Sequence, residues 1–148
     1  MNELRIFPIE GLPEVAPGDD LAAMLIDALS AMGEELTDDD VVVVTHKVVS
    51  KQEGRIAPIP TEDVYRQLIL DEASEIIRRR GDLVIAKTKH GFICANAAVD
   101  RSNTAAGTAI LLPVDPDRSA HRLRTLIERT TGASIGVVIT DTFGRAWR

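Results

Sequence analysis

Two runs of β-branched residues constrain the fold of this chain most, because each can form a strand and neither contains a charged residue. They are Val41–Val44 and Ile135–Ile139. A continuous run of this kind is typical of a strand that is buried on both faces, as in a parallel sheet. Such a sheet needs helices on its faces, so the two runs predict an α/β fold.

Three helices are predicted from capping residues at one end and from glycine or basic residues at the other. They run from Asp19 or Asp20 to Gly33, from Thr61 or Glu62 to Arg78–Arg80, and from Asp117 or Ser119 to Gly132. The other apolar runs predict short strands at Leu4–Pro8, Leu83–Lys87, Phe92–Ala95 and Ala109–Leu112, with a hairpin turn at Thr88–Gly91. This alternation predicts a mixed sheet, with one core, in a single domain spanning residues 1–148.

Composition narrows the classes of function. The chain has 17 basic and 23 acidic residues and a net charge of −6, which argues against a general affinity for nucleic acid. Its one cysteine, Cys94, excludes an intrachain disulfide and lies in an apolar run, where a small buried side chain is expected. We see neither a signal peptide nor a membrane-length apolar run, and we therefore expect a cytoplasmic protein.

The stretch Lys89–Asn103 combines small residues with polar ones. The small residues Ala95–Ala98 would let a ligand approach the backbone. An acid and an amide beside them, Asp100 and Asn103, could help to hold a hard cation or a phosphate. The same residue types also favour a plain β-turn, so a ligand site and a turn both remain open.

Basic residues follow the first β-branched run. Segment Thr45–Arg55 lies beyond the carboxyl end of that strand, where α/β proteins bind ligands, and Lys51 and Arg55 could hold a polyanion there. The alternative is a solvated loop. Arg78–Arg80 could also bind phosphate, but basic residues in the last turn of a helix stabilise its dipole, and we prefer that interpretation.

Acidic and hydroxyl side chains follow the second run in the same way. Asp141 and Thr142 are suitable ligands for Mg²⁺ or Mn²⁺, with Asp100 as a second carboxylate. Arg145 could reach the phosphates of a substrate. The chain has no P-loop, GxGxxG or HExxH motif, so a nucleotide site would be of another kind.

Five segments, in this order, carry a resemblance to a known family. They are PIEGLPEVAPGDDL, VVVVTHKVVSKQEGR, HGFICANAAVDRSN, LLPVDPDRSA and VVITDTFGRAWR. The chain resembles the coenzyme F420 γ-glutamyl ligase family, both the stand-alone archaeal enzyme and the N-terminal ligase part of the bifunctional actinobacterial one. The resemblance implies a homodimeric, GTP-dependent enzyme that uses Mg²⁺ or Mn²⁺, with K⁺ as a further candidate. It would phosphorylate a carboxylate of the deazaflavin precursor and let L-glutamate attack the acyl phosphate, with later glutamates added through γ-linkages.

The resemblance also implies roles for particular residues. Asp100 and Asp141 would be catalytic through the metal that they bind. The metal ligands would be Asp100, Asp141 and Thr142. The residues that would bind nucleotide or substrate are Leu12, Pro13, Glu14, Val15, His46, Lys51 and Asn103. The chain departs from the family at His46, where a small hydroxyl residue is common, and at Ala98, where glycine is common.

The family's ligase domain continues past the position of Arg148. We therefore expect this chain to represent the N-terminal part of the domain, to be nearly inactive alone, and to self-associate through exposed apolar surface or sheet edges. Two other functions stay open, namely a non-catalytic nucleotide- or deazaflavin-binding fragment and another metal-dependent phosphoryl-transfer enzyme. Glutamate-dependent GTP turnover would distinguish the ligase from both.

Overall fold

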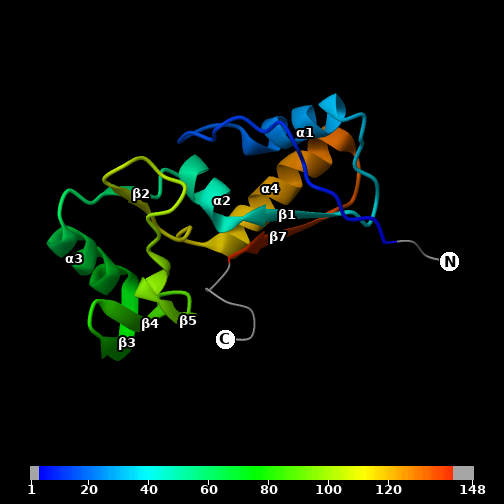
Figure 1. Ribbon diagram of the computed structural model, residues 1–148. Helices are drawn as coiled ribbons and strands as arrows, with labels where there is room; N and C mark the ends of the chain where they lie inside the picture. Colours follow the sequence, from blue (N-terminus) through cyan, green and yellow to red (C-terminus); the bar gives the residue numbers. More distant parts are fainter. Residues whose placement is uncertain (1–3, 142–148) are drawn as a thin grey trace.

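The structure is a computed structural model that describes residues 4–141, and its elements gather at two ends of an elongated molecule (Figure 1). One end contains α1 (Leu21–Ala31), β1 (Val41–Thr45), α2 (His46–Gln52), α4 (Pro116–Thr131) and β7 (Gly136–Thr140). The other contains α3 (Glu62–Glu72), β3 (Ala73–Arg80), β4 (Leu83–Thr88), β5 (Ile93–Ala95) and the short turn η1 (Asn96–Ala98). β2 (Ile56–Pro58) pairs antiparallel with β6 (Thr108–Ile110). This mixture of helices and strands confirms the predicted α/β class.

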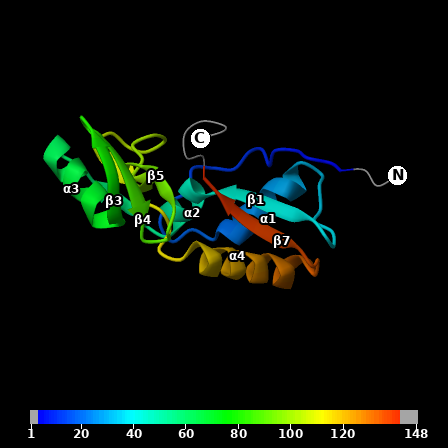
Figure 2. The ribbon, with the colours of Figure 1, turned by 90° about the horizontal axis from the view of Figure 1, so that it is seen from below.

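The two β-branched runs pair with each other in parallel, as predicted. Val41 lies opposite Gly136, and the register continues to Thr45 opposite Thr140. The prediction that both faces of these strands are buried was wrong, because Val41 and Val43 are 58% and 62% exposed. The described sheet has only these two strands, and α1 and α4 cover one face of it (Figure 2). The exposed valines form an apolar face that no described helix covers. Self-association through such a face was expected from the sequence, and it stays a prediction.

Capping explains where the two covering helices begin and end. The Asp20 carboxylate accepts a hydrogen bond of 3.1 Å from the Ala23 amide at the start of α1, as predicted. α4 is capped by Asp115 instead of Asp117 or Ser119, because Pro116 suits the first helical position. Gly132 ends α4 in the left-handed conformation (φ 80°), as predicted.

The second predicted helix is too long. α3 does begin after Thr61, but it ends at Glu72, and the arginine triplet lies in strand β3. Ile76 pairs with Ala86 of β4, and Arg80 pairs with Leu83, so pairing with a neighbouring strand decides the structure here. The proposed role of Arg78–Arg80 at a helix C-terminus was therefore wrong.

The remaining predicted strands have mixed outcomes. The hairpin of β4 and β5 is confirmed, and the strand near Ala109 is present as β6. The strand predicted at Leu4–Pro8 was wrong, since the described residues there form no regular element and Leu4 and Ile6 are highly exposed. Within residues 4–141, the strands divide among three small sheets.

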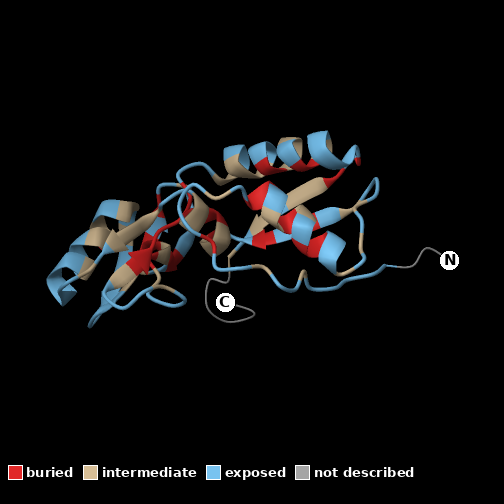
Figure 3. Cartoon of the chain, turned by 90° about the horizontal axis from the view of Figure 1, so that it is seen from above, coloured by how far each residue is buried: buried red, intermediate tan, exposed pale blue. Residues whose placement is uncertain are grey.

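Buried apolar side chains form two clusters, one at each end of the molecule (Figure 3). The first joins α1, β1 and α4 through residues such as Leu25, Val44 and Ile127. The second joins α3, β4 and β6 through Ile69, Ala86 and Ala109. The prediction of one core was therefore wrong, whereas the prediction that residues 1–148 form a single domain stays a prediction.

Candidate functional site

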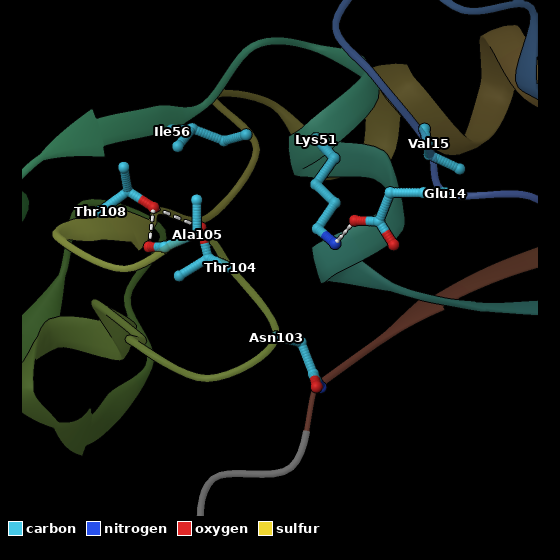
Figure 4. A pocket seen from close by; sticks show the side chains of 8 residues that line it. All are labelled: Glu14, Val15, Lys51, Ile56, Asn103, Thr104, Ala105 and Thr108. Carbon is cyan, nitrogen blue, oxygen red and sulfur yellow. Dashed lines mark hydrogen bonds and ion pairs between the residues drawn. The ribbon is translucent and has the colours of Figure 1, made fainter.

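A cavity of about 600 Å³ opens between α2, the segment before α1 and the loop before β6 (Figure 4). It is lined by Glu14, Val15, Lys51, Ile56, Asn103, Thr104, Ala105 and Thr108. Four of these residues were predicted to bind a nucleotide or substrate, namely Glu14, Val15, Lys51 and Asn103. Segments far apart in the sequence thus supply four predicted residues to one pocket.

Lys51 is the basic residue among the described residues that line this pocket. It lies in the last turn of α2, and its side chain is only 13% exposed. Its ammonium group pairs with the carboxylate of Glu14, and the two side chains point toward each other in Figure 4. A partly buried ammonium group at a cavity wall can bind a phosphate or carboxylate once its present partner is displaced.

The opposite wall is built from the loop after Asn103. The hydroxyls of Thr104 and Thr108 lie 2.6 Å apart, and Thr108 donates a 2.7 Å hydrogen bond to the carbonyl of Ala105. Asn103 has a φ of 55°, a left-handed conformation that asparagine tolerates better than most residues. Sequence reasoning missed Ile56, Thr104, Ala105 and Thr108; the polar residues directly after Asn103 were the one available signal.

Four other residues predicted to bind a ligand do not line this pocket. Leu12 is half-buried against the first apolar cluster, and Pro13 is exposed. His46 is 2% exposed and does not line the pocket. Arg55 is occupied by the carbonyl of Leu112 and by Glu72, so it has a structural role. The solvated loop considered for this segment is also wrong, since most of it forms α2.

The two described carboxylates predicted to bind metal contact consecutive residues at the start of α2. Asp141 Oδ1 lies 3.3 Å from His46 Nε2, and Asp100 Oδ2 lies 2.6 Å from Lys47 Nζ. Asp100 is fixed by a pair of backbone hydrogen bonds with Ile110, of 3.0 and 2.7 Å. Residues from three separate parts of the chain therefore meet at the junction of β1 and α2.

Asp100 is held in its charged form. Burial acts to raise the pKa of Asp100, but hydrogen bonds from Lys47 and from the backbone and hydroxyl of Ser102 outweigh it and lower that pKa. The Ser102 amide donates to Oδ1 at 2.7 Å, and its hydroxyl donates to Oδ2 at 2.9 Å. The carboxylate is therefore ionised at neutral pH and oriented before any ligand binds.

Asp100 and Asp141 are ligands of the chemical type that suits a magnesium ion whose coordination is completed by ligand phosphates. Mg²⁺ is usually held by one or two carboxylates, with phosphate oxygens and water filling the other positions. Within residues 4–141, no group of three or more His, Cys, Asp or Glu could hold a metal by itself. Thr142, the third predicted ligand, and Arg145 lie outside the described residues.

The small-residue run before Asp100 has a structural role. Asn96, Ala97 and Ala98 have φ values of 51°, 50° and 59°, so η1 is a left-handed turn. The Asn96 side chain accepts a hydrogen bond from the Val84 amide and donates one to the Tyr65 hydroxyl. The conformation of Ala98 explains why glycine, which lacks a Cβ, suits this position.

Cys94 is buried, as predicted, and packs close to the site. Burial raises the pKa of its thiol, a hydrogen bond from the Ala98 backbone partly opposes this shift, and the negative charge of Asp141 adds a smaller increase. A thiol with a raised pKa is a poor nucleophile. The structure thus agrees with a packing role for Cys94.

The fold and this site define a class of protein: an α/β chain with a lysine-containing pocket and with two carboxylates, Asp100 and Asp141, that contact the start of α2. The chain matches the family described as F420-0:gamma-glutamyl ligase over residues 11–64 and 60–148, which together cover most of its length. It belongs to this family, as the resemblance implied.

Curated relatives agree with this assignment. Over 98% of its length, the chain is 38% identical to the coenzyme F420:L-glutamate ligase of Methanothermobacter thermautotrophicus, and 40% identical to the protein of the same name from Methanopyrus kandleri. A third, from Archaeoglobus fulgidus, is 38% identical over the same share. The chain spans 62–64% of the length of these relatives. In the described part of the chain, no helix is long and apolar enough to cross a membrane.

Proposed function

We propose that this chain takes part in the ligation of L-glutamate to the deazaflavin precursor of coenzyme F420. The support is its family and the activity for which relatives such as the Methanothermobacter thermautotrophicus coenzyme F420:L-glutamate ligase are named. One structural observation carries the proposal: Glu14, Lys51 and Asn103, which are distant in sequence, line a single pocket. That pocket has the size for a phosphorylated ligand, and Lys51 would supply a positive charge once its pairing with Glu14 is displaced.

We further propose that GTP drives the reaction through an acyl phosphate. The terminal phosphoryl group of GTP would move to a carboxylate oxygen of the precursor, leaving GDP. The amine of L-glutamate would then attack the acyl carbon, form the amide bond and release inorganic phosphate. Such a sequence makes a carboxylate reactive without a covalent enzyme intermediate, so the protein must chiefly position the reactants and stabilise charge.

The described residues would divide this work. Lys51 would bind phosphate oxygens after leaving Glu14, and Asn103 would hydrogen-bond the same ligand from the opposite wall. Asp100 and Asp141 would hold Mg²⁺ or Mn²⁺, which neutralises phosphate charge during the transfer. Binding of K⁺, a homodimer and a cytoplasmic location stay predictions.

The experiment measures products from GTP, Mn²⁺ and the precursor, with and without L-glutamate, using the protein that carries this chain. We expect GDP and the glutamylated precursor to form together, and only with glutamate present. Asp100→Asn should abolish both products, whereas Lys89→Ala, which removes an ion pair with Glu72 outside the site, should retain them. Binding without turnover would favour the non-catalytic fragment, and glutamate-independent GDP formation would favour another phosphoryl-transfer enzyme.

A further inference from the structure

Lys47 has no role in the proposed reaction, yet it makes close contacts with the central carboxylate. Its ammonium nitrogen lies 2.6 Å from Asp100 Oδ2 and 2.6 Å from Ser102 Oγ. The lysine side chain is only 20% exposed, so water screens this pair less than it screens an ordinary surface ion pair. The ammonium group therefore lies where a cation bound to Asp100 would lie.

The contacts around Asp100 leave little room for a second cation. A carboxylate offers about four acceptor positions. Hydrogen bonds from the Ser102 amide and hydroxyl and from the Lys47 ammonium use three of them, and two of those three are on Oδ2. A divalent ion at Oδ2 must displace Lys47 or bind within a few ångströms of its positive charge, which like-charge repulsion disfavours.

We propose that Lys47 is a built-in counter-cation that competes with the divalent ion for Asp100. The inference rests on the proposed role of Asp100 as a metal ligand. Without metal, Lys47 keeps the carboxylate oriented. When the metal binds, the ammonium group leaves Oδ2 and becomes available to the anionic ligand that enters with the metal. Lys47 thereby sets the affinity for free metal and limits binding in the absence of that ligand.

The test is a titration of the full chain with Mn²⁺ alone, followed by electron paramagnetic resonance of the free ion. Lys47→Met removes the charge while retaining most of the side-chain volume, and it should bind Mn²⁺ about tenfold more tightly than the parent, as expected for loss of one screened positive charge. Lys47→Arg keeps the charge and should resemble the parent. Lys47→Gln, a second neutral variant, should repeat the gain if the methionine variant folds poorly.

Two controls separate this inference from the proposed function. Lys89→Met removes a different ion-paired lysine, which pairs with Glu72, and this variant should leave the Mn²⁺ affinity unchanged. Asp100→Asn should weaken Mn²⁺ binding and abolish the gain of Lys47→Met in the double variant. Equal or weaker binding by the neutral Lys47 variants, with Asp100→Asn still impaired, would overturn the inference alone. Parent-like Mn²⁺ binding by Asp100→Asn would overturn both the inference and the proposed metal site.

Discussion

The imidazole Nε2 of His46 lies 3.3 Å from Oδ1 of Asp141, at the junction of β1 and α2. The sequence predicted these two residues for different ligands, a nucleotide and a metal. In the structure the two side chains contact each other, and the other ring nitrogen of His46 lies 3.5 Å from the hydroxyl of Ser50. The histidine therefore has the position of a residue that orients Asp141.

Replacement of His46 tests this arrangement. His46→Ala should reduce the free energy of unfolding by about 1–3 kcal/mol, because it opens a buried space and leaves the Ser50 hydroxyl without this partner. Urea unfolding of both proteins measures the change. His121→Ala, which removes an exposed histidine of α4, is the control and should have little effect. Equal urea midpoints for His46→Ala and the parent would show that the buried contact does not contribute.

The lowered pKa of Asp100 predicts a pH dependence of stability. Its carboxyl group ionises more readily in the folded chain than in the unfolded chain, where the pKa is about 3.9. Its contribution is therefore present above about pH 4 and is lost as the pH falls through the lower, folded value. The stability difference between the parent and Asp100→Asn should be largest near neutral pH and should shrink in acid. An exposed aspartate variant, Asp27→Asn, serves as the control, and a pH-independent difference for Asp100→Asn would contradict this account.

Lys51 and Glu14 should have opposite effects on the pocket. Lys51→Ala should weaken GTP binding by about 1.5–3 kcal/mol, the contribution of a hydrogen bond to a charged group, with a larger loss at low salt. Glu14→Gln should strengthen GTP binding, because it removes the carboxylate that now pairs with Lys51. Isothermal titration calorimetry at two salt concentrations measures both. Parent-like affinity of Lys51→Ala at low salt would place this lysine outside the binding site.

Ala98→Gly should stabilise the fold. A left-handed conformation costs an L-residue about 1–2 kcal/mol, and the greater freedom of glycine in the unfolded chain offsets roughly half of this. The net gain should be about 0.5–1 kcal/mol in the free energy of unfolding, measured in urea. Ala120→Gly, within α4, should have the opposite effect because glycine is unfavourable in a helix interior. Destabilisation by Ala98→Gly would show that the Cβ of Ala98 contributes more by packing than the backbone loses by strain.

Local signals in the sequence predicted part of this structure. The two β-branched runs, the Asp20 cap and the Gly132 stop all depend on residues that are neighbours in sequence, and they were correct. The end of α3 at Glu72 could not be predicted in this way, because the pairing of Ile76 with β4 overrides the helical spacing. One-sided burial of β1 was likewise unpredictable, since it depends on how many strands and helices lie beside it.

The site shows the same division. Family motifs identified Lys51 and Asn103, which line the pocket. They also identified Asp100, which does not line the pocket and whose carboxylate is held in place by Ser102. They could not reveal that Lys47 contacts Asp100 or that His46 contacts Asp141, since both pairs are distant in sequence. Those contacts depend on the parallel pairing of β1 with β7 and on the backbone bonds between Asp100 and Ile110.

The most direct measurement follows an oxygen atom. The precursor is labelled with a heavy oxygen isotope in its reacting carboxylate and is incubated with GTP, Mn²⁺, L-glutamate and the protein that carries this chain. If the carboxylate becomes an acyl phosphate, the bond broken by glutamate leaves one labelled oxygen in the released inorganic phosphate, and mass spectrometry should detect it. Release of unlabelled phosphate during glutamate ligation, or no glutamate-dependent phosphate at all, would contradict the account.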